Sequence, residues 1–340
     1  MKRIAIVILN WNGSAMLRRF LPNVLANSLQ DADVYVADNA STDDSVALLT
    51  ADYPDVPLIR LAENYGFAEG YNQALKDLPH ELFLLLNSDV ETTPNWLGPL
   101  LAYMDAHPEV AAVQPKIRSE RHREQFEYAG AAGGYLDLFG YPYCRGRAFD
   151  TVEDDKGQYD EPQACFWATG AALLIRRDDY AGVGGLDARF FAHQEEIDLC
   201  WRLRSRGRGV ACVPQSVVFH VGGGTLGPGN PRKTYLNFRN NLLLLYKNLP
   251  ADRLHRVMRW RFVLDYVAAL KFVLTGEAGH AKAVWCARRD YGRMRKEFLS
   301  DREANLRAAV LPSIPEQRPC SLLAAYYLRG RKTFDQIFRL

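Results

Sequence analysis

The chain has 340 residues, of which 48% are hydrophobic and 24% are charged, and its net charge is +2. This is the composition of an ordinary globular protein, and it excludes an intrinsically disordered chain. The chain has no uninterrupted run of about 18 apolar residues, which argues against a membrane-spanning helix. The six cysteines form no CxxC pair and show no zinc-site spacing, so we expect reduced thiols in a cytoplasmic protein.

Charge is distributed unevenly along the chain. Residues 1–245 contain 23 Lys and Arg against 31 Asp and Glu, whereas residues 246–340 contain 19 against 9. Such an asymmetry indicates two parts with separate roles. We therefore predict one domain over residues 1–245 and a basic extension over residues 246–340.

The first part alternates short apolar runs with amphipathic segments. Strands are predicted at residues 4–9, 34–37, 58–61 and 82–86, and helices at 14–27, from 45 onward and at 68–78. This alternation predicts a parallel, doubly wound sheet. The N-terminal run 4–9 is too short for a signal-peptide core and is expected to form a buried strand. Ligands of such sheets bind at the carboxyl ends of the strands.

The remainder of the chain is less regular. Residues 119–162 are rich in Gly, Tyr, Arg and Asp, which predicts a long loop or hairpin excursion over a site. Further strands are predicted at 168–176, 210–213 and 217–220, a helix at 195–206, and a flexible loop or lid at 222–231. From residue 233 the pattern is helical to the end, with a break near Pro312 and Pro315.

Polar and small residues follow the predicted strands and should meet at one edge of the sheet, at the carboxyl ends of the strands. Asp38 is placed to accept hydrogen bonds from a base or a ribose, and Trp11, two residues after Leu9, could stack on a base. Gly66 and Gly70 would allow close approach of the backbone to a ligand. Each piece alone fits an ordinary turn without a ligand, but three such pieces at consecutive strand ends favour a binding site. No G-x-G-x-x-G follows the first strand, so a dinucleotide fingerprint is absent.

Two further positions have the chemistry of metal ligands. The apolar strand 82–86 delivers Asp89 to the sheet edge, where a carboxylate can bind a hard divalent cation that bridges a diphosphate. His220 follows another predicted strand and precedes the Gly-rich loop. A turn carboxylate and a structural histidine remain the alternatives.

The segment around residue 196 places carboxylates at the start of a helix. Helical spacing puts Glu195, Asp198 and Arg202 on one face, while Glu196 lies over apolar neighbours. Partial burial of a carboxylate raises its pKa towards that of a useful general base. The alternative is an ordinary acidic first turn favoured by the helix dipole.

Taken together, these residues resemble the family 2 glycosyltransferases with the GT-A fold, and in particular the rhamnosyltransferase-like branch of bacterial surface-polysaccharide assembly. The resemblance covers about residues 3–250. Its motifs are residues 7–12, 36–43, 64–68, 87–89, 170–174 and 195–202, followed by His220. It implies a Rossmann-like α/β catalytic domain over residues 1–245 with a helical C-terminal extension.

The resemblance also implies roles for individual residues. The donor nucleotide would be bound by Leu9, Trp11, Asp38, Asn64, Gly66 and Asn72. A divalent cation, Mg²⁺ or Mn²⁺, would be held by Asp89, His220 and Asn87. The catalytic base would be Glu196, with Glu195 as the alternative, and the acceptor would border Gly170 and Trp201.

Two positions depart from the family pattern. Asn87 replaces the first Asp of the metal motif, which implies a weak or Mg²⁺-tolerant metal dependence. Glu196 replaces the usual Asp, which changes the reach of the base towards the acceptor.

The resemblance implies inverting transfer of a sugar from dTDP-rhamnose or a UDP-sugar to a saccharide acceptor that is expected to be lipid-linked. A sugar-phosphate nucleotidyltransferase is a weaker alternative, because residues 12–18 lack its Gly-rich, Lys- or Arg-containing phosphate loop. A non-catalytic sugar-nucleotide sensor or scaffold is the alternative outside enzymes.

The basic extension contains an amphipathic segment at residues 256–274 with Arg, Trp and Phe. Asp265 and Lys271 prevent a membrane span, but the basic balance fits contact with anionic headgroups on the inner face of the cell membrane. A packing or homodimer element is the alternative. Nucleic-acid binding is disfavoured because no known motif accompanies the charge.

Overall fold

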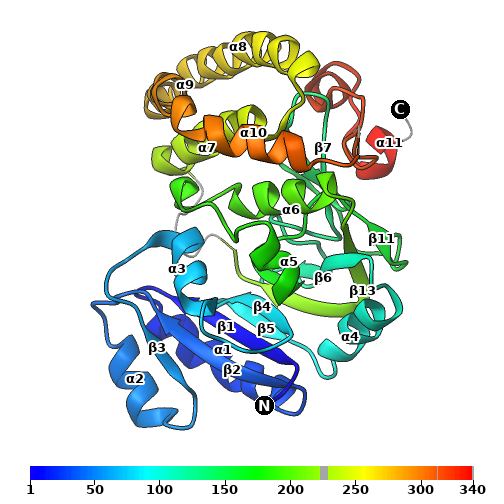
Figure 1. The fold of residues 1–340 in the computed structure, drawn as a ribbon. Helices are drawn as coiled ribbons and strands as arrows, with labels where there is room; N and C mark the ends of the chain where they lie inside the picture. The colour runs from blue at the N-terminus through cyan, green and yellow to red at the C-terminus, as the bar shows by residue number, and fades with distance from the viewer. Residues whose placement is uncertain (223–228, 312, 339–340) are drawn as a thin grey trace.

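The computed structural model describes residues 1–222, 229–311 and 313–338. Its main sheet has helices on both faces, and the C-terminal helices form a further layer at one end (Figure 1). The strands of this sheet are β1 (Ile4–Asn10), β2 (Ala32–Asp38), β3 (Leu58–Arg60), β4 (Leu82–Asn87), β5 (Val90–Thr92), β6 (Val110–Ser119), β11 (Gln163–Ala164), β12 (Ala172–Arg176) and β13 (Gly209–His220). Their order is β11-β13-β6-β12-β4-β1-β2-β3, and β5 pairs with β13.

The helices that cover the main sheet follow the expected alternation. They are α1 (Ser14–Ser28), α2 (Ser45–Asp52), α3 (Gly66–Leu75), α4 (Leu97–Ala106), α5 (Arg177–Gly182) and α6 (Glu195–Ser205). The four predicted strands and three predicted helices of the first 90 residues are all present. Helix α4 and strand β6 were not expected, and the two short strands predicted at 210–220 form the single strand β13, with a register irregularity between Val213 and Val217.

The sheet is mixed rather than parallel throughout. Strands β4, β1, β2 and β3 are parallel, as predicted, but β12 runs antiparallel to both β4 and β6. The expectation fails here because β12 follows the long excursion after β6 and not a crossover helix, so its direction is not fixed by a βαβ connection.

Burial on both faces explains the apolar strands. Ile4, Ile6 and Ile8 of β1 belong to one core cluster together with residues of α1 and α4. The alternate residues Ala5 and Val7 belong to a second cluster with residues of α3 and α6. Successive side chains of a strand point to opposite faces, so a strand between two helical layers must be apolar at nearly every position.

The excursion at residues 119–162 is organised by hairpins. It contains a second, antiparallel sheet formed by β7 (Gly134–Leu136), β8 (Pro142–Cys144), β9 (Arg147–Ala148) and β10 (Thr151–Val152). Tyr135 and Tyr143 of this sheet are buried. The hairpin alternative was therefore correct, and the long-loop alternative was wrong.

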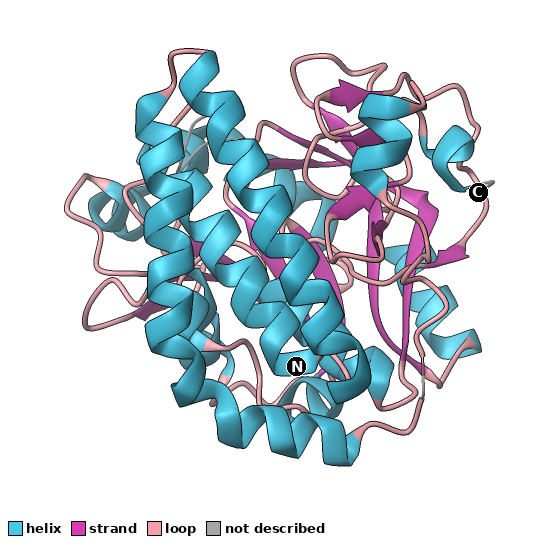
Figure 2. Cartoon of the chain, turned by 90° about the horizontal axis from the view of Figure 1, so that it is seen from above, coloured by secondary structure: helices cyan, strands magenta, loops and turns pink. Residues whose placement is uncertain are grey.

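The C-terminal layer consists of α7 (Pro231–Asn248), α8 (Ala251–Leu274), α9 (Ala278–Met294) and α10 (Leu299–Ala308), which lie together when the molecule is seen from above (Figure 2). The boundary expected at residue 245 falls inside α7. Most of the predicted lid, residues 223–228, lies outside the described residues. Within the described part of the chain, no helix is long and apolar enough to cross a membrane.

The prediction of helix to the C-terminus is wrong beyond Ala308. The next residues carry Pro315 and Pro319, which disfavour a continuous helix. Gln317 instead bridges to Leu136 of β7, and only a π-helical turn, Ala324–Leu328, and α11 (Phe334–Phe338) follow.

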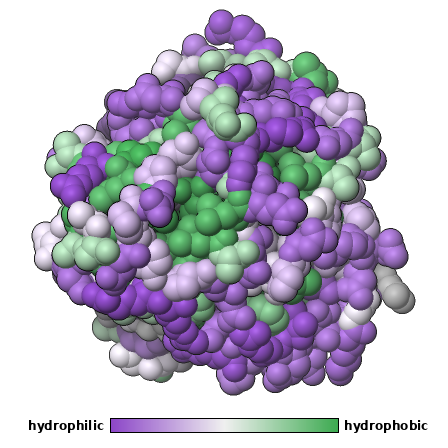
Figure 3. All heavy atoms as spheres, turned by 90° about the horizontal axis from the view of Figure 1, so that it is seen from below, coloured by the Kyte–Doolittle hydropathy of each residue, from purple (hydrophilic) through white to green (hydrophobic). Residues whose placement is uncertain are grey.

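Two surface and covalent features complete the fold. The face opposite the C-terminal layer has a central hydrophobic area surrounded by mostly hydrophilic residues (Figure 3). All six cysteines are free, and four of them are buried, as expected for reduced thiols.

A buried cluster of charges attaches α8 to the rest of the protein. The Arg261 Nε donates to Asp265 Oδ1 at 3.1 Å, and the Arg288 Nη1 of α9 donates to Asp265 Oδ2 at 2.6 Å. Tyr141 and Asn241 complete the surroundings of Arg261, which is 1% exposed. Asp265 therefore neutralises two cations at a site that water does not reach.

Replacing Asp265 with Ala is expected to lower the free energy of unfolding by about 3 to 5 kcal/mol, because it leaves buried cations without their counterion. Urea unfolding followed by circular dichroism measures this change. Asp252→Ala, at an exposed position in the first turn of α8, is the control and is expected to cost less than about 1 kcal/mol. Equal losses in the two variants would contradict the prediction.

Candidate active site

The carboxyl ends of β1 and β2 form a hydrogen-bonded polar edge. Asn10 lies opposite Asp38 in the parallel register, and its Nδ2 donates to Asp38 Oδ1 at 3.2 Å. The other Asp38 oxygen accepts from the backbone N–H of Ser41 at 3.0 Å. Asp38 is thus held in place at the sheet edge. Trp11, which follows Asn10 in the chain, is 47% exposed, so its ring is accessible to a planar ligand.

Asn39 connects this edge to the start of α3. Its Nδ2 donates to Asn64 Oδ1 at 3.1 Å and to the Gly66 carbonyl at 3.0 Å, and its Oδ1 accepts from the Tyr65 N–H at 3.0 Å. Gly66 has a φ of +74°, and a Cβ there would lie 2.6 Å from the Phe191 ring. Only glycine fits this contact, so the expected close approach at residue 66 is to another part of the protein.

Leu9 and Asn72 lie near this edge but differ in what their side chains contact. Leu9 packs against Gly70, where a Cβ would come within 2.9 Å of its Cδ2. The Asn72 amide donates to the Leu186 carbonyl at 2.8 Å and accepts from the Leu186 N–H at 3.0 Å and the Tyr180 hydroxyl at 2.7 Å. The structure therefore uses Asn72 to tie α3 to the segment before α6.

The three residues expected at a metal site lie together. Strand β5 pairs with β13 so that Val90 is opposite His220, which brings the neighbouring Asp89 against the histidine. Asp89 Oδ1 is 3.1 Å from His220 Nε2, and Asn87 Nδ2 is 3.3 Å from the same nitrogen. Asp89 and His220 are 131 positions apart in the sequence, and the antiparallel pairing of β5 with β13 brings them into contact.

Glu127 is a member of this cluster that the sequence analysis missed. Its Oε2 lies 3.5 Å from His220 Nδ1, on the side of the ring opposite Asp89. A carboxylate behind a histidine commonly fixes the ring orientation and tautomer. Glu127 lies within the irregular excursion, where no periodic pattern marks it.

Charge in this cluster is strongly coupled. Burial alone would lower the pKa of His220, but hydrogen bonds and charge from Asp89 and Glu127 outweigh it and raise the pKa to about 10. Burial would raise the pKa of Asp89, and the histidine instead lowers it. Without a bound cation, the protonated His220 ring and the Asp89 carboxylate therefore form an ion pair.

The donor set fits a divalent cation whose remaining ligands come from a substrate. An Asp oxygen and an imidazole Nε2 converge at one point, with an amide beside them and an orienting carboxylate behind the ring. Among the described residues, no group of three or more His, Cys, Asp or Glu side chains is arranged to hold a metal ion by itself. Such a site would bind a cation together with an oxygen-rich ligand better than the cation alone.

Glu195 and Glu196 begin α6 but occupy different surroundings. Glu195 is 4% exposed, whereas Glu196 is half-buried and lies beside Gly170, whose ideal Cβ would be 4.0 Å from Glu196 Cβ. One oxygen of each carboxylate, Oε2, has no hydrogen-bond partner among the described residues. Glu196 is the more exposed residue of the two.

Burial determines the protonation of both groups. It raises the pKa of Glu196 to about 7, against an ordinary value of 4.5. Burial and the neighbouring Glu196 charge raise the pKa of Glu195 well above its usual range. This agrees with the expectation that a carboxylate on the apolar side of α6 gains the pKa of a useful base.

The backbone before α6 is strained. Phe191, His193 and Gln194 have φ angles of 65°, 69° and 75°, in the left-handed region that residues other than glycine seldom adopt. Each such residue costs about 1–3 kcal/mol and persists only where its surroundings fix it. The strain lies immediately before the two glutamates and therefore sets where α6 begins.

Asn240 of α7 is the residue that fixes this segment. Its Nδ2 lies 2.9 Å, 2.9 Å and 2.8 Å from the carbonyls of Phe190, Ala192 and His193. Its neighbour Asn241 donates to Gln194 Oε1 at 3.0 Å. The sequence analysis missed both, although two adjacent asparagines before a run of four leucines are an unusual feature of a buried helix.

The structure separates the two expected acceptor residues. Gly170 lies against Phe67 and Glu196, where its lack of a side chain leaves room beside the carboxylate. Trp201 is buried and packs edge-to-face on Phe166, with ring centroids 5.2 Å apart. Trp201 therefore supports α6 from within the core, which corrects the expectation that it borders an acceptor.

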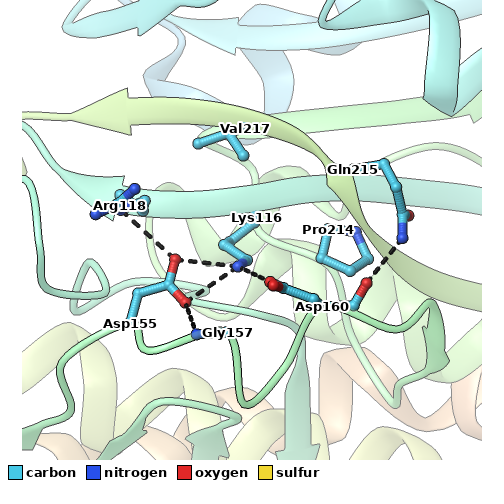
Figure 4. Close-up of a pocket in the computed structure, with 8 residues that line it drawn as sticks. All are labelled: Lys116, Arg118, Asp155, Gly157, Asp160, Pro214, Gln215 and Val217. Carbon is cyan, nitrogen blue, oxygen red and sulfur yellow. Dashed lines mark hydrogen bonds and ion pairs between the residues drawn. The ribbon is translucent and has the colours of Figure 1, made fainter.

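A separate hollow of about 430 Å³ lies along β6 and β13 (Figure 4). Lys116 Nζ donates to both oxygens of Asp155, at 3.1 Å and 3.0 Å, and pairs with Asp160. Arg118 also faces Asp155. Because its charges pair with one another and its side chains are not those at the strand ends, this hollow is not the candidate active site.

Comparison with known proteins identifies the family. Residues 5–170 match the family model described as Glycosyl transferase family 2. Over 235 residues the chain is 26% identical to the N-acetylglucosaminyl-diphospho-decaprenol L-rhamnosyltransferase of Mycobacterium tuberculosis, which covers 64% of this chain and 75% of the relative. Residues 5–170 therefore form a family 2 glycosyltransferase domain, and the chain is a glycosyltransferase. This glycosyltransferase is also 27% identical over 222 residues to the O-antigen biosynthesis protein RfbC of Myxococcus xanthus, covering 64% of this chain but 17% of that protein.

Solved structures show the same fold. GalNAc-T7 with UDP, GalNAc and Mn²⁺ matches with a TM-score of 0.57 and 16% identity, over 73% of this glycosyltransferase and 48% of that chain. S. aureus TarS 1-349 in complex with UDP-GlcNAc matches with a TM-score of 0.54 and 13% identity, over 91% and 89%. The α/β domain of this glycosyltransferase thus has the predicted GT-A fold, with C-terminal helices added.

Asn240→Ala is expected to lower the free energy of unfolding by about 2 to 4 kcal/mol, because it removes the side-chain donor shared by the Phe190, Ala192 and His193 carbonyls in a strained segment. Chemical denaturation measures the loss. Asn305→Ala is the matched control, since Asn305 is also buried but donates one hydrogen bond, to Asn248. A loss no larger than that of the control would show that Asn240 does not hold the strained segment.

Proposed function

We propose that the glycosyltransferase moves a sugar from a nucleoside-diphosphate donor, dTDP-rhamnose or a UDP-sugar, to a lipid-linked saccharide acceptor in cell-surface polysaccharide synthesis, with inversion at the anomeric carbon. The observation that carries this proposal is that Asp38 and Asp89 lie at the carboxyl ends of parallel strands and Asp89 contacts His220. Glu196 lies beside Gly170, whose neighbour Ala171 accepts a hydrogen bond from the Asn87 N–H. The names of the relatives support the substrate class, since one acts as an L-rhamnosyltransferase on a diphospho-decaprenol acceptor.

The proposed donor site uses the polar edge of the sheet. Asp38 would accept hydrogen bonds from the base or ribose, Trp11 would stack on the base, and Leu9 would line the pocket. Asn64 and Gly66 would shape its far side through their contacts with Asn39. Asp38 fits this role because Asn10 and Ser41 already orient its carboxylate.

The proposed metal ligands are Asp89, His220 and Asn87, with Glu127 orienting the imidazole. A bound Mg²⁺ or Mn²⁺ would supply charge stabilisation for the diphosphate. Two neighbours in fold, GalNAc-T7 and the mannosyltransferase PcManGT, were solved with Mn²⁺.

The proposed reaction is a single displacement. The acceptor hydroxyl oxygen attacks the anomeric carbon, the bond from that carbon to the diphosphate oxygen breaks, and Glu196 takes the hydroxyl proton. The pKa of about 7 suits Glu196 to this role, because a substantial fraction of the carboxylate is ionised at neutral pH and that form is basic enough to accept a proton. Glu195 is too deeply buried to reach an acceptor without a rearrangement.

We also propose that the glycosyltransferase works in the cytoplasm, in peripheral contact with the inner face of the cell membrane, where a lipid-linked acceptor is reached. The basic extension at residues 246–340, with net charge +10, supports this placement. A homodimer built through the same extension is the alternative.

dTDP or UDP with Mn²⁺ or Mg²⁺ is expected to raise the melting temperature, since a ligand at about 100 times its Kd adds about 2.7 kcal/mol of stability. Asp38→Asn and Asp89→Asn should each reduce the shift. Asp44→Asn, at a surface pair with Arg18, is the control and should leave it unchanged. A well-folded protein that no nucleotide stabilises would point to a scaffold role instead.

Glu196→Gln is expected to lower kcat/KM by about 10²- to 10⁴-fold, because the variant lacks the base. Nucleotide binding should survive. In the wild type, kcat/KM should rise with pH up to about 7 and level off above it, since the ionised form of Glu196 is the active one.

Glu195→Gln is the matched control for this experiment, because it removes the adjacent carboxylate while keeping its shape. Sugar transfer by this variant should stay well above that of Glu196→Gln. The reverse order of activities would assign the base to Glu195.

A further inference from the structure

Helix α8 has its charged side chains inside and its apolar side chains outside. Arg261 and Asp265 are 1% and 0% exposed, whereas seven apolar residues on the other side are each 50–78% exposed. We refer to these seven as the α8 stripe: Trp260, Phe262, Val263, Val267, Leu270, Val273 and Leu274. Among the described residues, Phe139 borders Trp260 and Arg288 lies over the Phe262 ring, and these contacts leave most of the stripe exposed.

The α8 stripe is broad as well as long. At 100° per residue, its positions cover an arc of about 160° around the helix and run for about 21 Å along it. A two-stranded coiled coil needs a narrower seam of two positions per heptad. The width therefore favours a broad apolar surface over a single partner helix.

The charges along the α8 stripe are basic. Arg256 and Arg259 are exposed just before it, and Lys271 is exposed within its length. Asp265 is the only acidic residue between positions 253 and 276, and it is buried, while the exposed Glu277 follows the end of the helix. A second copy of the chain packed in parallel on this face would oppose the three cations to their own copies, whereas an anionic surface would neutralise all three.

Aromatic side chains border the same region. Trp285 of α9 is 50% exposed and carries the Arg289 guanidinium 5.3 Å from its ring centre. Tyr266 lies near Phe262, with ring centroids 4.9 Å apart. Tryptophan, tyrosine and arginine with apolar stems are the side chains that favour the boundary between lipid headgroups and acyl chains.

We propose that the α8 stripe docks the protein on an anionic lipid bilayer, with α8 lying in the plane of the membrane. The seven apolar side chains enter the headgroup–acyl boundary, and Arg256, Arg259 and Lys271 contact lipid phosphates. This proposal rests on the proposed function, which places the protein in peripheral contact with the membrane. It adds the face of the protein and the lipid chemistry that would make this contact.

Flotation of the full chain with lipid vesicles tests this proposal. Vesicles with about 30% phosphatidylglycerol in phosphatidylcholine should carry the protein at low salt, and phosphatidylcholine alone should carry much less. Val267→Gln/Leu270→Gln should lower binding by about tenfold or more, since it replaces two apolar side chains that would be buried in the acyl boundary. Leu299→Gln, 49% exposed on α10 and outside the stripe, should bind as the wild type does.

Three results would overturn the proposal. They are wild-type protein that does not float, a double variant that floats as well as the control, and a wild-type dimer that the double variant converts to monomer without any vesicle binding. Circular dichroism of each variant confirms folding.

The nucleotide melting shift on the same preparations separates the two proposals. A shift without flotation would overturn the docking alone, and flotation without a shift would overturn the proposed function alone.

Discussion

The hydrogen bonds from Asn240 to the carbonyls of Phe190, Ala192 and His193 are the constraint on which the candidate active site depends. They hold Phe191, His193 and Gln194 near left-handed backbone angles, and those angles decide where α6 starts and how Glu196 is presented. The Phe191 carbonyl also accepts from the Phe67 N–H at 2.8 Å, at the start of α3. Helices α3, α6 and α7 therefore meet at one strained segment, and the added C-terminal helix is part of the catalytic architecture.

Partners, and not burial alone, decide which carboxylates of α6 keep their charge. Asp198 is fully buried, yet Arg202 and Lys247 lower its pKa against the effect of burial. Two residues earlier, Glu196 has no cationic partner among the residues that the structure describes, and burial raises its pKa to about 7. Helix α6 thus carries Asp198, which stays ionised, and Glu196, which titrates near neutral pH. The two differ because Asp198 lies on the side of α6 that faces Lys247 of α7.

The sequence predicts local features well and long-range partners poorly. The strands and helices up to residue 87 follow from periodicity, and Asp38, Asp89, Glu196 and His220 follow from strand ends and family motifs. The antiparallel insertion of β12 could not be predicted, because a long excursion and not a helix sets its direction. Glu127 and Asn240 were missed for the same reason, since their roles depend on residues 93 and about 50 positions away.

Helix α8 shows why amphipathic patterns need a structure to be oriented. Arg261 and Asp265 are four residues apart, a spacing that in sequence reads as a solvent-facing ion pair. Arg288, Tyr141 and Asn241 approach from other elements and make this side the inner one. Asn241 also donates a hydrogen bond to Gln194 Oε1. The hydrogen-bond network behind the α8 stripe is therefore continuous with the strained segment before Glu195. The face that we propose to meet lipid and the carboxylates that we propose to meet the acceptor are thus attached to the same pair of asparagines, which fixes the active site at a constant position relative to the bilayer.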